Sequence, residues 1–324
     1  MGFKKLLGAL GVGGPLVDTV LEQVAVRPGG TVNGEVRLKG GSSDAEVQHV
    51  TLELEARVEA EHGDGESRGT VTFGRFTVAG GFRLAAGEER ALPFSIPLHP
   101  EAPVTELQGR PIGIGLGVRT ELALAQAVDK GDVDPLRVAP LPVQEAILDA
   151  FWRLGFGLRS ADLEYGRLHG TAQQLPFFQE IELIPPAQHA GRINEVELTF
   201  VAGAHSMDVI LEADKRGGFF SSGQDTVLRF TVGLDEVRDW GAEVDGWVAQ
   251  LAERRSLFGG HPGQGYGGQG YAGKGHGHGG HGGHGAGLGL AGGLAAGVVG
   301  GMVLGEVFDE VGDFFGGDEG GDEG

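Results

Sequence analysis

The chain has 324 residues, which is long enough for two domains, and it contains no cysteine, which excludes disulfide bonds and thiolate metal sites. Its formal net charge of −20 argues against a nucleic-acid-binding protein, because contacts to phosphate need a surplus of Lys and Arg. A chain without cysteine fits a reducing compartment, so we expect a cytoplasmic protein.

The first residues predict a short amphipathic helix. Phe3, Leu6, Leu7 and Leu10 recur at the spacing of one helical face. Glycines interrupt this apolar run and no small-residue cleavage site follows it, which argues against a secretory signal peptide. We expect this helix to dock on the first lobe of the protein, with contact to a membrane surface as the alternative.

Strands and turns follow from Pro15 onward. Polar and apolar residues alternate from Val50 to Val58, as in a strand with one buried face. The polar, glycine-rich stretch Glu61–Arg68 is expected to be a loop. Seven or so strands with turns at short spacing indicate a β-sandwich. The strands are expected at Leu16–Val26, Thr31–Lys39, 50–58, Thr70–Val78, Phe82–Leu84, Leu92–Pro97 and Ile112–Leu124.

A helix interrupts this pattern after Pro140, and strands then resume. The helix has an apolar stripe made by Val143, Ile147, Leu148, Phe151, Trp152 and Leu154. A last amphipathic helix is expected near Asp235–Leu251, with Val237 and Trp240 on its apolar stripe. The strands between the two helices are expected at Leu158–Leu168, Gln179–Ile184, Val196–Ala202, Met207–Ala213 and Thr226–Val232.

Glycine separates this folded body from a tail. Residues 259–324 hold 29 of the 63 glycines, and a core cannot form where side chains are so sparse. The predicted organisation is a sandwich lobe over residues 1–139, a linker helix over 140–154, a second sandwich lobe with its terminal helix over 155–258, and a mostly disordered Gly/His-rich tail over 259–324. The tail ends in an acidic segment.

Motifs of catalysis are missing from the sequence. It has no Walker A loop, no HExxH and no G-x-S-x-G. Asp129, Asp132 and Asp134 could offer oxygens to Ca²⁺, but the spacing of an EF-hand is absent, so a solvated acidic loop between the lobes is expected. We therefore expect neither an enzyme nor a bound cofactor.

The tail carries a histidine run that could bind metal. Imidazoles on a flexible chain can wrap Ni²⁺, Zn²⁺ or Cu²⁺, although ordering such a chain opposes tight binding. The alternative is a linker whose histidines reflect composition alone. The candidate ligands are His276, His278, His281 and His284.

A glycine ladder follows the histidines in a stretch without charged residues. As a helix, about 21 residues would span the hydrocarbon layer of a bilayer, and small residues four apart allow close helix packing. In water, its glycines disfavour a helix by about 8 kcal/mol. Disorder, insertion into a membrane and self-association into a homo-oligomer therefore stay open. The ladder consists of Gly285, Gly289, Gly293, Gly297, Gly301 and Gly305.

Several motifs in the body resemble one bacterial family. They are Phe3–Leu7, Val17–Glu22, Pro28–Val36, Lys39–Gly41 and Leu175–Leu183. These stretches resemble the SpoOM sporulation-control family, whose members are arrestin-like β-sandwich proteins. The resemblance covers about residues 1–255 and rests on motifs of structure, so it carries over no partner-binding residue.

The resemblance implies an all-β fold of two tandem arrestin-like β-sandwich lobes with a connecting helix and a C-terminal helix. It also implies a non-catalytic regulator that docks other proteins of sporulation or cell-division control. The alternative function is a membrane-associated or metal-binding protein whose Gly/His-rich tail carries the activity.

Overall fold

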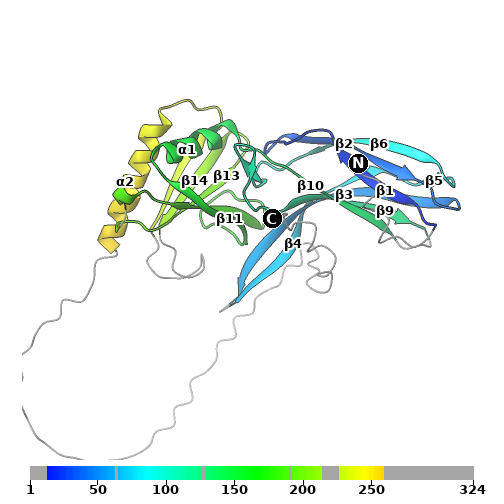
Figure 1. The fold of residues 1–324 in the computed structure, drawn as a ribbon, viewed down its shortest axis with the longest axis horizontal. Coiled ribbons are helices and arrows are strands. Elements are labelled where there is room, and N and C mark those ends of the chain that lie inside the picture. Colours follow the sequence, from blue (N-terminus) through cyan, green and yellow to red (C-terminus); the bar gives the residue numbers. More distant parts are fainter. Residues whose placement is uncertain (1–12, 63–64, 126–128, 190, 214–225, 259–324) are drawn as a thin grey trace, which may run out of the picture.

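A computed structural model describes residues 13–62, 65–125, 129–189, 191–213 and 226–258. The predicted N-terminal helix, the histidine run and the glycine ladder lie outside these residues. Two lobes lie side by side along the longest axis of the molecule (Figure 1). The elements of the first lobe are β1 (Leu16–Leu21), β2 (Thr31–Lys39), β3 (Ala45–His62), β4 (Gly65–Ala79), β5 (Phe82–Leu84), β6 (Glu89–Pro97), β7 (Glu106–Leu107), β8 (Arg110–Pro111), β9 (Leu116–Leu124) and β10 (Lys130–Pro135).

The first lobe is a sandwich of two sheets. One sheet has the order β1-β2-β6, and the other runs β10-β9-β3 with β4 and β5 on the far edge of β3. Alternation along β3 sends every second residue inward, and these residues are all buried. They are Val50, Leu52, Leu54, Ala56 and Val58. The predicted half-buried strand is therefore the centre of the first core.

Several strands of the first lobe differ from the predicted bounds; β1, for example, ends at Leu21 and not at Val26. The expected loop at Glu61–Arg68 is wrong, because β3 and β4 pair as far as His62 and Gly65, and Arg68 forms an ion pair with Glu59 at 2.8 Å. Backbone pairing does not require apolar side chains. The expected strand Ile112–Leu124 begins only at Leu116, because Gly113 has a φ of 89°, which breaks an extended chain.

The aspartates expected in a solvated loop between the lobes lie elsewhere. Asp132 and Asp134 belong to β10, which pairs with β9 inside the first lobe. Asp132 accepts a hydrogen bond from the backbone N–H of Thr19 at 3.1 Å, and Asp129 accepts one from Leu124 at 2.9 Å. The expectation of a solvated loop between the lobes is therefore wrong, since these residues lie within the first lobe, where Asp129 and Asp132 accept hydrogen bonds from the backbone of neighbouring strands.

The second lobe contains a five-stranded antiparallel sheet and two helices. Its core joins inward side chains of the strands, such as Leu198 and Val209, to Phe151 and Trp247 of the helices. Both helices thus cover one face of the sheet, as Figure 1 shows. The elements are α1 (Pro142–Arg153), β11 (Gly157–Tyr165), β12 (Phe177–Ile184), a short 3-10 helix η2 (Ala187–His189), β13 (Val196–Ala202), β14 (Ser206–Ala213), β15 (Thr226–Gly233) and α2 (Trp240–Phe258).

The last helix starts later than its apolar pattern suggests. α2 begins at Trp240, and the carboxylate of Asp239 accepts the backbone N–H of Ala242 at 3.2 Å. An aspartate in this position caps a helix, which fixes the start. Val237, expected on the apolar stripe, precedes the helix and is 95% exposed. The helix also continues to Phe258 rather than ending at Leu251.

The fold class predicted from the sequence is confirmed: the chain is mainly β, with two lobes, a connecting helix and a C-terminal helix. Within the described residues, no helix is long and apolar enough to cross a membrane. Whether the predicted boundaries separate parts of the chain that fold independently stays a prediction.

Candidate functional site

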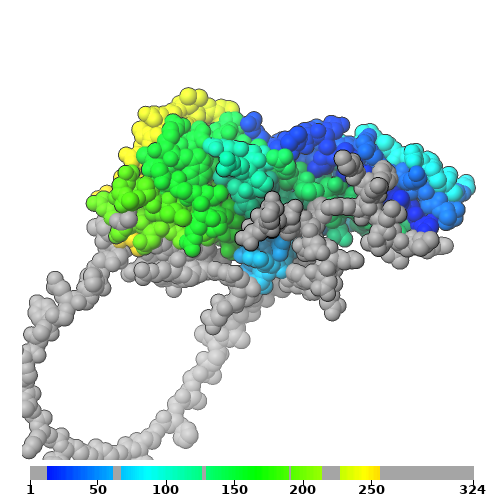
Figure 2. Space-filling view, viewed as in Figure 1, coloured from blue at the N-terminus to red at the C-terminus, as the bar shows by residue number. Residues whose placement is uncertain are grey.

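The two lobes meet where one long strand changes its neighbour. β4 occupies one edge of β3 from Val50 to His62, and β9 occupies the other edge from Val47 to Ala56. Beyond Ala56 this second edge passes to β11 of the second lobe, with Glu59 opposite Glu164 in parallel pairing. A single ten-stranded sheet therefore runs through both lobes. In the space-filling view, the light-blue residues of β4 are exposed at this junction (Figure 2).

The lobes also exchange core residues. Leu163, Leu175 and Phe177 come from the second lobe but belong to the first core, where Phe177 meets Phe73 edge to face with ring centres 5.7 Å apart. Conversely, Val104 and Leu107 precede the connecting helix but belong to the second core. Each core thus depends on side chains supplied by the other part of the chain, which resists sliding of the lobes.

Polar contacts fix the register of this junction. The side-chain amide of Gln179 accepts from the backbone N–H of Val104 at 3.0 Å and donates to its carbonyl at 2.9 Å. The carboxylate of Glu101 accepts the backbone N–H groups of Gln174 and Leu175 at 2.8–2.9 Å. These contacts satisfy backbone groups that the strand pairing leaves free, so the junction is specified by geometry as well as by packing.

A substitution at Gln179 tests how much its contact with Val104 stabilises the junction. A Gln179→Glu substitution keeps the shape but puts a carboxylate oxygen against the carbonyl of Val104. We expect it to lower the free energy of unfolding by about 1–3 kcal/mol at neutral pH. Urea denaturation measures this loss.

The matched control for that substitution is Gln188→Glu at an exposed position. It makes the same chemical change away from the junction and should be neutral within about 0.5 kcal/mol. Equal effects of the two substitutions would show that the added charge, and not the contact with Val104, is responsible.

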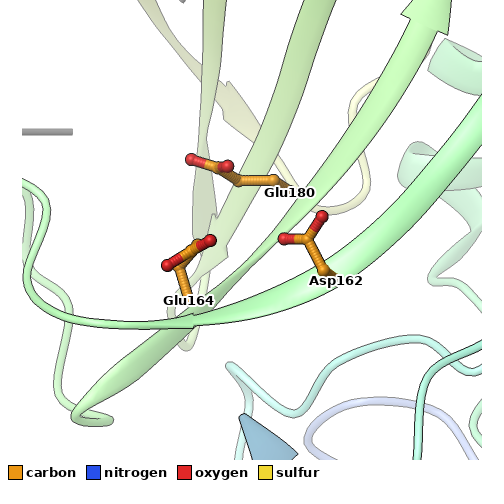
Figure 3. Close-up of side chains that lie close together, drawn as sticks. All are labelled: Asp162, Glu164 and Glu180. Carbon is orange, nitrogen blue, oxygen red and sulfur yellow. The ribbon is translucent and has the colours of Figure 1, made fainter. Parts of the chain in front are cut away.

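Three carboxylates gather beside the pairing between the lobes. Asp162 lies opposite Glu180 in the register of β11 and β12, and Glu164 lies two residues further along the same face. Figure 3 shows the three side chains on neighbouring strands. One oxygen from each lies within 4.8 Å of the others. Carboxylate oxygens suit Ca²⁺ or Mg²⁺, but acidic clusters of this size are common without an ion.

Asp162 lies in an environment that favours its protonated form. Burial, together with the neighbouring charges of Glu180, Glu164, Glu182 and Glu59, raises its pKa to about 7. Its Oδ1 atom is buried and accepts no hydrogen bond from the described part of the chain. The carboxyl group of Asp162 therefore keeps its proton to a higher pH than an ordinary aspartate does.

A groove in the first lobe offers a second feature. It has a volume of about 530 Å³ and lies between β1 and β10, with Asp18, Val24 and Arg137 among its lining residues. Asp134 also lines it, and burial together with the charge of Asp132 raises the pKa of Asp134 to about 8. This groove stands apart from the junction and contains side chains of the first lobe alone.

The site residues predicted from the sequence, which form the histidine run and the glycine ladder, lie outside the described residues. The sequence patterns indicate neither the acidic cluster nor the contact of Gln179 with Val104. One available signal was the adjacent pair Phe177 and Phe178, since two consecutive buried aromatics in a strand indicate that both faces are covered.

Comparisons with known proteins agree with this architecture. The model of the SpoOM protein family matches residues 3–217. The sporulation-control protein spo0M of Bacillus subtilis (strain 168) is 34% identical over 216 residues, which cover 66% of this chain and 81% of that protein. The crystal structure of Spo0M from Bacillus subtilis superposes with a TM-score of 0.65 and 28% identity, covering 75% of this chain and 99% of that one.

The matched region contains the junction. It includes the strand pairing of Glu59 with Glu164, the contact of Gln179 with Val104, and the aromatic pair Phe73 and Phe177. The stretch Leu175–Leu183 is one of those that resemble the family in sequence. It contributes side chains to the first core, to the acidic cluster and to the second core. The chain belongs to the SpoOM family.

Proposed function

We propose that this protein is a non-catalytic regulator of sporulation that works in the cytoplasm by docking other proteins. The observation that carries the proposal is membership of a family whose curated relative is named a sporulation-control protein. The docking mechanism draws support from the fold: two lobes share one sheet and exchange core residues, which gives a scaffold with fixed surfaces.

The surfaces for docking would be sheet faces, edge strands and grooves. β15 is the last strand of the long sheet and pairs only with β14 among the described strands. Exposed strand edges recur as places where an extended segment of a partner adds to a sheet. The groove between β1 and β10 offers a second docking surface in the first lobe.

Complementation of a Bacillus subtilis strain that lacks its own Spo0M tests the function. The full chain should restore the frequency of heat-resistant spores, and the chain ending at Phe258 should restore it equally, because the lobes carry the matched region. Restoration by the full chain alone would favour the alternative, in which the tail carries the activity. Failure of both chains, while the Bacillus protein succeeds from the same promoter, would refute the proposal.

A further inference from the structure

The groove between β1 and β10 lies where the edges of two sheets face each other. Among the described strands, β1 pairs only with β2 and β10 pairs only with β9, so each has one edge without a neighbouring strand. The volume of the groove, about 530 Å³, is that of a ligand-binding cleft. Covering its apolar lining would be favourable, because that removes apolar area from water. This lining includes Val20, Leu21, Val24, Val32 and Leu136.

Two carboxyl groups give this groove a negative character. Asp18 of β1 and Asp134 of β10 both line it. Burial and the neighbouring charge of Asp132 raise the pKa of both groups. The Oδ2 atom of Asp134 is buried and accepts no hydrogen bond from the described part of the chain. A cation that entered the groove would favour the ionised form of both carboxyl groups.

The two arginines that line the groove bond to other carboxylates. Arg37 donates to Glu35 at 2.6 Å, and Arg137 donates to Glu106 at 2.7 Å. The charge of Arg37 also lowers the pKa of Asp18, but burial of Asp18 outweighs it. The groove therefore suits an apolar segment that carries its own positive charge.

The N-terminal segment, residues 1–12, combines these two properties. It contains no acidic residue. The match to the model of the SpoOM family begins at residue 3, so most of the segment lies within the matched region. Its apolar and cationic residues are Phe3, Leu6, Leu7 and Leu10 with Lys4 and Lys5.

The segment joins the described chain next to β1. Gly13 has a φ of 101°, and its carbonyl accepts the backbone N–H of Ser42 at 2.9 Å, which fixes where the chain turns into β1. A helix over residues 3–10 would be about 12 Å long. Strand residues rise by about 3.3 Å each, so this helix and the two residues after it reach back along β1 as far as Asp18.

A second hollow continues the groove along this path. Its volume is about 310 Å³, and Leu16 and Ala91 line it at the start of β1. Asp18 and Arg37 line both hollows, so the two are neighbours on the surface. Together they extend from the start of β1 to the carboxyl group of Asp134.

We propose that the N-terminal segment, residues 1–12, docks in the groove between β1 and β10, with its apolar residues against Val20 and Leu21 and its lysines beside Asp18 and Asp134. Attachment at Gly13 favours this contact, because it keeps the segment at a high effective concentration beside the groove. A partner protein that used the same groove would have to displace the segment. The contact holds whether or not the protein controls sporulation, since it depends only on the first lobe.

The experiment measures where the segment lies in the full chain. The chain has no cysteine, so Gly2→Cys and Ser95→Cys provide two unique sites for nitroxide labels. Ser95 is exposed on β6 of the first lobe. Electron double resonance should give a narrow distance distribution in the otherwise unchanged chain. Asp18→Asn together with Asp134→Asn should abolish the narrow peak, because the lysines lose their partners.

Two further chains show whether the groove itself is responsible. Lys4→Glu together with Lys5→Glu should also abolish the narrow peak, and it does so without changing the folded lobes. Asp44→Asn together with Glu46→Gln is the matched control, since it removes two negative charges from exposed positions of the first lobe outside the groove. This control should keep the narrow peak. Circular dichroism checks that each chain is folded.

Three outcomes would overturn the proposal. One is a broad distribution in the otherwise unchanged chain. Another is a narrow peak that survives both the aspartate and the lysine substitutions, because the segment would then dock elsewhere. The third is a narrow peak that forms only when vesicles containing phosphatidylglycerol are added, since an anionic membrane and not the groove would then hold the segment.

Discussion

Replacing Phe177 with alanine is expected to lower the free energy of unfolding by about 3–5 kcal/mol, because the truncation leaves a cavity in a packed core. The side chain is 2% exposed and belongs to the first core, although its backbone lies in β12 of the second lobe. Its loss also removes the edge-to-face contact with Phe73. The substitution therefore weakens the first lobe and its attachment to the second together.

Two probes separate these effects in urea denaturation. All three tryptophans, Trp152, Trp240 and Trp247, follow the start of α1, so their fluorescence reports on the second lobe. Far-ultraviolet circular dichroism reports on both lobes. In the Phe177→Ala chain, the midpoint from dichroism should fall further than the midpoint from fluorescence, since the cavity lies in the first core.

Tyr165→Ala is the matched control for the Phe177 substitution. Tyr165 lies directly opposite Phe177 in the strand register but is 37% exposed. Its truncation should cost less than that of Phe177, because more than a third of the side chain already faces solvent and no closed cavity forms. A similar loss from the two substitutions would contradict the assignment of Phe177 as a core link between the lobes.

Local patterns predicted much of the architecture. The alternation from Val50 to Val58 identified a strand that is buried on one face, and the stripe containing Ile147 and Phe151 identified α1. These signals are reliable because the side chains of a strand or helix repeat with the geometry of the backbone. The bounds were less well predicted where a single residue decides them, as Gly113 and Asp239 do.

The junction could not be predicted from such patterns. Glu59 and Glu164 are distant in the sequence, and nothing in either segment indicates that β11 follows β9 along the edge of β3. Glutamates at alternate positions of a strand, as at Glu180 and Glu182, are typical of a solvated face. Glu180 is instead 3% exposed. Tertiary packing, which a local pattern does not contain, determines both features.

Replacing Gly34 with alanine is expected to destabilise the first lobe by about 3 kcal/mol, at the upper end of the usual cost of overpacking. Gly34 lies in the central strand of its sheet, on the inward-facing side. A Cβ atom there would lie 2.4 Å from the carbonyl oxygen of Val20 and 2.7 Å from the ring of Phe94. Backbone and ring would both have to move. Urea denaturation of the full chain measures the loss.

Gly69→Ala separates this steric effect from the general effect of removing a glycine. Gly69 lies in β4, and a Cβ atom there would meet nothing within 4 Å. This control should be neutral or raise stability by up to about 1 kcal/mol, because alanine restricts the unfolded chain. Equal losses at the two positions would rule out close approach as the reason for glycine at position 34.

The ring of Phe94 allows the steric argument to be tested further with a double substitution. Phe94 lies opposite Gly34 in the register of β2 and β6, and its ring occupies the space that the missing side chain leaves. Phe94→Leu alone should cost stability through a cavity. Combined with Gly34→Ala, it should cost less than the sum of the single effects, because the two residues compete for one volume. The recovery should be partial, since the carbonyl of Val20 stays in place, and strict additivity would exclude the competition.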